Sequence, residues 1–536
     1  MKRNRALRRI ISLAFCLVMI ACSTATAFAC TAIYVGSGVS DDGTVMIAKS
    51  NDYQDVWANY VTITERITDE PGRRMPVDND ATVFAELPAT TYRYTSTPWM
   101  DSATALNGLG KDATICENEY GVAMIMSITS FSNAAALQAD PLIDHGLTEF
   151  TAVDLVTCQS ATAREGVEVL CSLLDQYGSS EVNIALIADQ KETWYVEMYN
   201  GHQYAAVKLP EDRVCVFGNE FSLEYLSDYE DSIVSPELVT LAEENGFAVY
   251  GREKELNLLA SYSGDEVVTN YSHMRTWMGH KVLSPDDYGA YDKNEKYPLC
   301  FVPEDKVSLQ DVMELIRNRF EGTEYCPDET GRTDMRVIGT DTALSVHIAQ
   351  IYPELPANMS CVTWESTGPA LYGVFVPVSN AVLSISEPYG RNQSAEEAGL
   401  FDTEQYPYYR FKELTTLGVE KNAYKIYGEP VRAYWHEAEA GMIRGMSEVL
   451  KNASEVNDPE LSSQYITDYC NAMQEQAFSD AGKLLNDVRW YMSKNSNTMK
   501  NGRNPETHDA TDEVKKIEPL AVGLDGAAYQ KIPEIK

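Results

Sequence analysis

The sequence predicts a layered α/β or α+β fold with a helical C-terminal part, on two observations. Short segments rich in β-branched and aromatic residues alternate with segments of helical period between residue 30 and about residue 380. From residue 430 to about 492, Ala, Glu and Met recur at helical spacing, which predicts long helices. Strand groups separated by pairs of helices are typical of packed layers.

The first 29 residues have the pattern of a secretory signal peptide. A basic start precedes the apolar run 10–22, and small residues then lead to Ala27-Phe28-Ala29. The apolar run is shorter than the ~20 residues that a membrane span needs. Cleavage after Ala29 predicts a secreted protein or one at the cell-envelope exterior. The alternative is lipoprotein-type cleavage at Cys22, although Met19 stands where Leu is usual.

The mature chain is large and acidic. Removing 29 residues from 536 leaves 507, more than the ~250–300 residues of one simple core, so we expect one large layered domain or two domains. The net charge of −37 becomes about −42, because the removed segment holds five basic and no acidic residues. Such a surface repels nucleic acid and anionic lipid. We therefore expect no nucleic-acid partner and no membrane association after cleavage.

The mature chain is expected to open with a β-hairpin. Residues 30–36 predict a strand, residues 38–43 supply turn chemistry, and residues 45–48 predict the returning strand. Further strands are expected at 121–126, 182–187, 193–198, 204–208, 345–351, 361–364 and 373–377. Helices are expected at 151–156, 163–174 and 309–320.

The cysteines and histidines form no metal motif. Nine of the eleven cysteines follow Ala29, and none forms C-x-x-C. With Cys30 free, eight remain that could pair outside the cell, and buried unpaired thiols are the equal alternative. The seven histidines lack H-x-x-x-H spacing, and the chain has no EF-hand loop. We expect neither a metal nor an organic cofactor.

Cys30 is the candidate nucleophile, because cleavage after Ala29 makes it the first residue. The α-amino group of an N-terminal Cys can act as its own base. A thiol pKa of about 8.5 beside an amine pKa of about 7.7–8.0 gives a reactive pair after modest shifts. Taken alone, a cysteine in this place is more often an incidental small hydrophobic residue next to a cleavage site, and the motifs that follow in the sequence decide against that interpretation.

An ordered set of short motifs resembles the cysteine dipeptidases of the N-terminal-nucleophile (Ntn) superfamily. Penicillin V acylase and bile-salt hydrolase are more distant members of that superfamily. The resemblance runs from Cys30 to about Asn380, and a weaker resemblance continues to about residue 490. The matching segments are 29–36, 42–44, 47–53, 118–123, 194–197, 201–205, 212–214, 218–221, 275–277, 321–323 and 362–364.

The resemblance implies an α+β fold, a four-layer αββα Ntn-hydrolase sandwich in which Cys30 opens a strand. It implies a dipeptidase that hydrolyses peptide bonds through an acyl-enzyme on Cys30, with dipeptides or small peptides as substrates. The expected parts are a signal peptide at 1–29, a peptidase domain at 30–492 and a polar, partly disordered tail at 493–536. Whether the protein forms an oligomer is left open.

The resemblance also implies roles for three further residues. Asp52 would orient and polarise the α-ammonium group of Cys30, and its ordinary alternative is a turn or N-cap Asp. Asn219 would donate its side-chain amide to an oxyanion, and it is otherwise a turn residue. Arg275 would fix the nucleophile region electrostatically, and a surface ion pair is the alternative reading.

The chain departs from the family pattern at two places. Lys49 stands where relatives usually carry Arg, and Lys lacks the planar bidentate fork of Arg. No Asn stands near residues 127–129, where the acylase relatives place a second oxyanion donor, so a backbone N–H would have to serve. His202 belongs to a structural Gly-His signature and is not counted as catalytic.

Two other functions remain open at this stage. One is an Ntn amidase that acts on acyl-amino acids, bile-salt conjugates or penicillin-type amides. The other is a non-catalytic secreted binding protein on the same scaffold. A cysteine placed directly after an A-x-A site disfavours the binding protein, and the motifs at 201–202 and 218–219 favour the dipeptidase over the amidase.

Overall fold

The computed structural model describes residues 30–53, 56–98, 113–126, 128–264, 271–332, 334–394, 397, 400–419, 423–500 and 511–533. The expected signal peptide lies outside the described residues. Within the described ranges, no helix is both long enough and apolar enough to cross a membrane.

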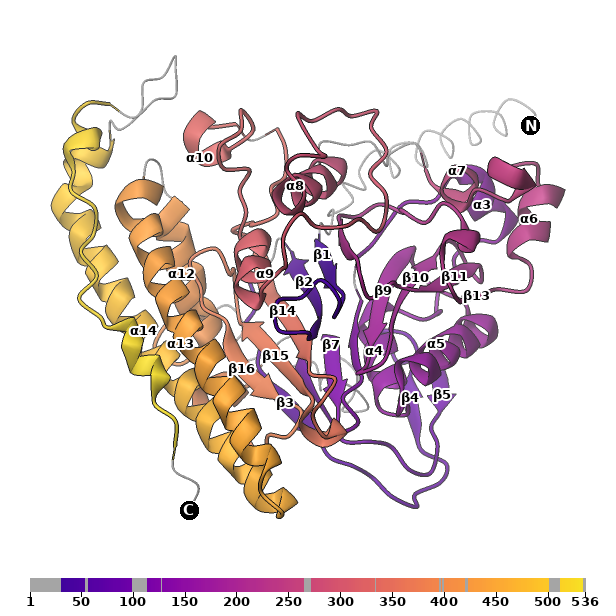
Figure 1. Cartoon of the computed structure of the whole chain (residues 1–536), viewed down its shortest axis with the longest axis horizontal. Helices are drawn as coiled ribbons and strands as arrows, with labels where there is room; N and C mark the ends of the chain where they lie inside the picture. The colour runs from indigo at the N-terminus through magenta and orange to yellow at the C-terminus, as the bar shows by residue number, and fades with distance from the viewer. Residues whose placement is uncertain are drawn as a thin grey trace, which may run out of the picture.

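Two antiparallel sheets form the centre of the fold (Figure 1). The six-stranded sheet has the order β12 (Val214–Phe217), β1 (Ala32–Val35), β2 (Val45–Asp52), β14 (Ala343–Ile351), β15 (Cys361–Ser366), β16 (Val376–Ser379). The eight-stranded sheet has the order β13 (Ser232–Val234), β11 (Tyr204–Lys208), β10 (Thr193–Met198), β9 (Asn183–Ala188), β8 (Ala123–Ile125), β7 (Ala113–Asn118), β6 (Tyr94–Pro98), β3 (Thr62–Thr64). A separate hairpin joins β4 (Arg74–Pro76) to β5 (Phe84–Glu86).

Three buried clusters show that the two sheets face each other between layers of helices. Tyr34 and Ile47 of the first sheet share one cluster with Leu186 and Tyr195 of the second, so this cluster fills the space between the sheets. Alternate residues point to opposite faces of a strand. The outer faces therefore build two further cores, one with helices α8, α9 and α12 to α14, and one with α4 and α5.

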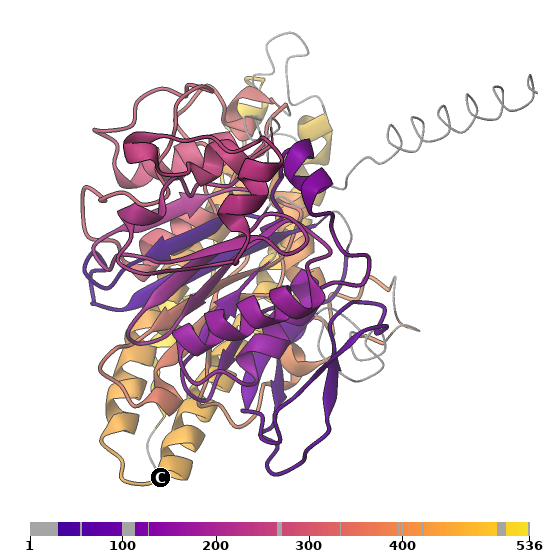
Figure 2. The ribbon, with the colours of Figure 1, turned by 90° about the vertical axis from the view of Figure 1, so that its right-hand side faces the viewer.

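These helices complete the four layers. Their bounds are α4 Glu149–Thr157, α5 Ala163–Tyr177, α8 His273–Leu283, α9 Leu309–Ile316, α12 Pro407–Val419, α13 Glu429–Ser454 and α14 Pro459–Lys500. The shorter helices are α3 Ala134–Ala139, α6 Leu238–Glu244, α7 Leu258–Tyr262, α10 Pro327–Thr330 and α11 Glu387–Gly390. In Figure 2 the purple helices of residues 149–177 lie in front of the strands, and the orange and yellow C-terminal helices lie behind them. The expected α+β, αββα architecture is confirmed.

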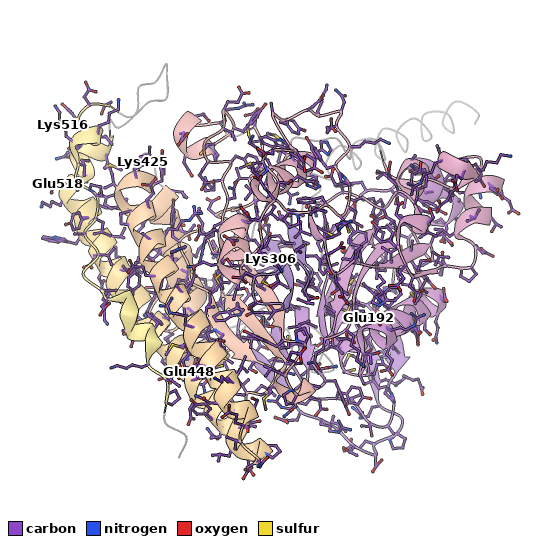
Figure 3. All side chains as sticks on the ribbon, in the orientation of Figure 1. Glu192, Lys306, Lys425, Glu448, Lys516 and Glu518 are labelled. Carbon is purple, nitrogen blue, oxygen red and sulfur yellow. The ribbon has the colours of Figure 1, made fainter. Side chains whose placement is uncertain are left out.

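The C-terminal part is helical, as expected, and it extends beyond residue 492. Helix α14 runs to Lys500, so the expected boundary at residue 493 falls inside it. Val514, Leu520 and Tyr529 of the following segment are buried against the helical part. Exposed charged side chains such as Lys425 and Glu448 project outward from this part (Figure 3). The division into domains itself stays a prediction.

The expected opening hairpin is confirmed as β1 and β2, which pair from Ala32 opposite Lys49 to Val35 opposite Met46. All eight residues of β2 are buried, because this strand lies inside its sheet and between two layers. The remaining expected strands and helices are present: β10 and β11 have the expected ends, and the others have shifted ends. Strands β3 to β7, β12 and β13 were not expected, since most of them are short and their sequences carry little alternation.

Candidate active site

The register of three strands places Cys30 between residues that are distant in sequence. Ala32 lies opposite both Lys49 of β2 and Phe217 of β12. In antiparallel pairs, two residues back along one strand face two residues forward along its neighbour. Continuing these registers by two residues brings Cys30 towards Asn51 on one side and Asn219 on the other, with Asp52 at the end of β2. Cys30, Asp52 and Asn219 are all buried.

Arg275 joins Cys30 and Thr31 to Asn219. Its Nη1 donates to the backbone carbonyl of Cys30 at 2.6 Å and to Thr31 Oγ1 at 2.9 Å. Its Nη2 donates to Asn219 Oδ1 at 2.8 Å, and its Nε donates to the carbonyl of Tyr271 at 2.6 Å. Burial lowers the pKa of Arg275 to about 10, so the guanidinium remains charged at neutral pH.

Two glycines allow Arg275 to reach this position. A Cβ at Gly279 of α8 would lie 2.1 Å from Val216 Cγ1, so the helix packs closely on β12 only with glycine there. A Cβ at Gly218 would lie 3.1 Å from Arg275 Cζ and 3.0 Å from the carbonyl oxygen of Ser272. The Gly218-Asn219 motif therefore combines the space for the guanidinium with the amide that it binds.

Hydrogen bonds at both the oxygen and the nitrogen of its side-chain amide orient Asn219. Its Oδ1 accepts from Arg275, and its Nδ2 donates to the backbone carbonyl of Thr129 at 2.7 Å. A primary amide carries two N–H groups, so the second one can serve an oxyanion. The arrangement fixes which way the amide points.

Asp52 is buried beside Cys30 without strong compensation. Burial raises its pKa from 3.8 to about 6, although the charges of Arg336 and Arg275, the Ser50 side chain and the charge of Lys49 lower it. The nearest cation, Arg336 Nη2, lies 3.6 Å from Asp52 Oδ2, beyond hydrogen-bond distance. Neither carboxylate oxygen has a hydrogen-bond partner among the residues that the structure describes.

Lys49 adds a buried amine to the site. Burial lowers its pKa, while the charges of Cys30, Glu149 and Asp52 raise it. Its Nζ has no hydrogen-bond partner within the described part of the chain. Burial raises the pKa of the Cys30 thiol, Lys49 lowers it, and Asp52 and Glu149 raise it again. A cation near the thiol favours the thiolate, which is the nucleophilic form.

Sequence reasoning missed two charged neighbours of the site. Glu149 opens α4 and is buried, and Arg336 approaches Asp52 from a loop before β14. An acidic residue in the first turn of a helix is ordinary, so nothing in the sequence distinguishes Glu149. Arg336 lies outside every motif that carries the resemblance.

One cavity of the described structure lies away from this site. It has a volume of about 960 Å³ and lies between α9, α13 and the segment after α8, lined among others by Glu314 and Arg432. None of the expected site residues lines it. We place the site at Cys30 because the thiol, the carboxylate, the amide and the guanidinium lie together there. His202 hydrogen-bonds through Nδ1 to Asp140 at 2.9 Å, in keeping with a structural role.

The structure thus brings Cys30, Asp52, Asn219 and Arg275 into one buried cluster, and their catalytic roles stay predictions. A cysteine at the head of a strand in an αββα sandwich, with an acid, an amide and a guanidinium around it, is the arrangement that the resemblance to the Ntn hydrolases implies. The model of peptidase family C69 matches residues 29–437. The chain therefore belongs to peptidase family C69.

Curated relatives extend this comparison. The chain is 28% identical over 378 residues to a protein named probable dipeptidase B of Streptococcus pyogenes serotype M1, covering 68% of this chain and 74% of the relative. It is 31% identical to the probable dipeptidase B of Lactococcus lactis, with 66% and 74% covered. It is 29% identical to a probable dipeptidase of Salmonella dublin, with 65% and 80% covered.

One solved structure that resembles the chain is the conjugated bile acid hydrolase of Clostridium perfringens. The identity is 10%, the TM-score is 0.29, and the match covers 63% of this chain and 89% of that chain.

Proposed function

We propose that this protein is an exported dipeptidase that forms an acyl-enzyme on Cys30, after removal of residues 1–29. Membership of family C69 and the relatives named as dipeptidases support the substrate class. The match to the family model begins at residue 29, directly before the proposed nucleophile.

The observation that carries the mechanism is the buried Asp52 carboxylate. Its two oxygens lack hydrogen-bond partners within the described residues, and they lie at the end of β2 beside Cys30. A buried carboxylate without a partner is costly. The α-ammonium group that cleavage after Ala29 creates would supply both a charge and hydrogen-bond donors at this position. We infer that Asp52 holds that group.

The proposed reaction begins with transfer of the thiol proton to the α-amine of Cys30. The sulfur then attacks the carbonyl carbon of the first residue of the dipeptide, and the oxyanion accepts from Asn219 Nδ2. The α-ammonium returns its proton to the leaving amine as the peptide bond breaks. Water, deprotonated by the same amine, hydrolyses the thioester and regenerates Cys30.

The precursor would be inactive under this mechanism, because an amide nitrogen at Cys30 is not basic. Ala29→Arg should block cleavage and accumulate an inactive precursor. N-terminal sequencing and intact mass of the protein from the cell exterior test the first part of the proposal. A different first residue, or full activity of uncleaved protein, would contradict it.

A substrate panel tests the second part and separates the three functions. Protein that begins at Cys30 is offered unblocked dipeptides beside glycine- and taurine-conjugated acyl substrates. Hydrolysis of the dipeptides supports the proposal. Hydrolysis of the acyl conjugates alone would replace it with the amidase, and hydrolysis of neither would favour the binding protein.

A further inference from the structure

Glu149 is a buried carboxylate that the mechanism above does not use. Its Oε2 accepts a hydrogen bond from Asn183 Nδ2 at 2.7 Å, and Thr129 Oγ1 lies 3.5 Å from the same oxygen. The carbonyl of Thr129 accepts from Asn219 Nδ2 at 2.7 Å. One residue therefore links Glu149 to the amide that we assign to the oxyanion.

The charge of Glu149 influences the nucleophile electrostatically. It raises the pKa of both the Cys30 thiol and the Lys49 ammonium. A second carboxylate adjoins it, because Glu181 Oε1 accepts from the backbone N–H of Glu149 at 2.5 Å. Burial and the charge of Glu149 raise the pKa of Glu181 well above its ordinary value. The negative charge of Glu149 therefore favours a cation beside it.

We propose that the Glu149 carboxylate binds the α-ammonium group of the dipeptide substrate. The inference rests on the proposed function. The ammonium nitrogen of a dipeptide is separated by a single carbon from the carbonyl that the sulfur attacks, so its counter-ion has to lie close to Cys30. The contacts of Thr129 with both Glu149 and Asn219 place Glu149 next to the amide that we assign to the oxyanion. Its charge provides a physical reason for cleaving unblocked dipeptides rather than N-acyl amides.

The test compares each dipeptide with its des-amino analogue, for example Phe-Ala and 3-phenylpropionyl-Ala. Wild-type protein should cleave the dipeptide with a kcat/KM at least 100-fold higher. In Glu149→Gln this ratio should fall at least 10-fold, mainly through KM for the dipeptide, and Glu149→Asp should restore part of it. The matched control, Glu181→Gln, should retain the preference.

The outcomes separate this inference from the proposed function. A wild-type enzyme that cleaves both compounds equally, a Glu149→Gln variant that loses activity with an unchanged ratio, or a collapse of the ratio in Glu181→Gln would each overturn the inference. Failure of wild-type protein to cleave either compound would refute the proposed function instead.

An independent observation concerns two cysteines beside the edge strand β12. Val214 and Phe301 exchange both backbone hydrogen bonds, at 2.9 and 3.0 Å. Cys215 and Cys300 are the next pair along these antiparallel segments, which makes them a non-hydrogen-bonded pair with Cα atoms about 4.5 Å apart. Their Sγ atoms lie 3.1 Å apart. A disulfide accommodates Cα distances of about 4.4–6.8 Å.

We infer that Cys215 and Cys300 form a disulfide in the exported protein. Cys300 is partly exposed and lines a cavity of about 300 Å³, so it can attack an external disulfide donor. That step gives a mixed disulfide and releases one donor thiol. The Cys215 thiolate then displaces the second donor thiol, so the donor takes up the two electrons that the cysteines lose.

The disulfide would attach the segment that ends at Cys300 to β12. That segment packs against α8, the helix that carries Arg275. His273 Nε2 and His280 Nε2 of α8 lie 2.9 and 3.0 Å from the carbonyls of Glu295 and Pro298. The segment that ends at Cys300 therefore holds α8 against β12. Reduction should lower the Tm by about 2–4 °C, as expected for a cross-link closing a long loop in a chain of this size.

Peptide mapping without reductant tests the bond. We expect one cross-linked species containing Cys215 and Cys300, with an intact mass about 2 Da below that of reduced protein, since two hydrogens are lost. The same result is expected when reduced, purified protein is incubated with glutathione disulfide, whether or not the protein is exported. Complete alkylation of both thiols after that incubation would overturn the inference. The Cys215→Ser and Cys300→Ser double variant should show no Tm change on reduction.

Discussion

Replacing Asp52 with Asn should stabilise the protein while it abolishes catalysis. Burial raises the pKa of Asp52 from 3.8 to about 6. The folded state therefore binds this proton more tightly than the unfolded state does. The favourable contribution is complete below about pH 4 and is lost as the pH rises through about 6. A shift of about 2 units corresponds to about 3 kcal/mol of unfolding free energy.

Asp52→Asn removes this titration. At pH 8 the unfolding free energy of the variant should exceed that of the parent protein by up to about 3 kcal/mol, whereas at pH 4 the two unfolding free energies should be nearly equal. The gain should be greatest with Ala29 still attached. In protein that begins at Cys30, the α-ammonium compensates the carboxylate, so the gain should shrink. The difference between the two forms measures the coupling between Asp52 and the ammonium group.

The assay is urea unfolding at pH 4, 6 and 8, with turnover measured on the same samples. The matched control is Glu117→Gln, because burial raises the pKa of Glu117 to about 8 outside the site. That variant should gain stability and keep its activity. The reasoning is refuted if Asp52→Asn is no more stable than its parent at pH 8 with Ala29 attached, or if its gain is the same at pH 4.

Three further predictions concern the other residues of the site. Cys30→Ser should fold normally and lose most of its turnover, because a hydroxyl is less acidic and less nucleophilic than a thiol; equal rates in a dipeptide assay would exclude the thiol mechanism. Asn219→Ala should lower kcat by about 10²–10³-fold, equivalent to about 2.7–4 kcal/mol, and a change confined to KM would contradict the oxyanion role. Arg275→Lys should lower both kcat and Tm, since Lys lacks the planar fork that contacts Cys30, Thr31 and Asn219 together; wild-type values for both quantities would show that the fork is unnecessary.

The sequence alone determined the local features of this protein. The β-branched and aromatic residues of segment 30–36, the turn residues at 38–43 and the apolar segment 45–48 predicted the opening hairpin. The helical period after residue 430 predicted α13 and most of α14. The ordered motifs, which include Cys30, Asp52, Asn219 and Arg275, indicated the family before any contact was known.

Only the tertiary structure decided which residues meet. Asn219 and Arg275 reach Cys30 because β12 and α8 pack beside β1, and a contact across 245 positions leaves no periodic trace in the sequence. Glu149 and Arg336 could not be found earlier, since each resembles an ordinary charged residue until its burial is known. The same holds for Cys215 and Cys300, whose pairing follows from a bridge between Val214 and Phe301. Local chemistry is encoded by neighbours along the chain, whereas the electrostatics of a buried site depends on neighbours in space.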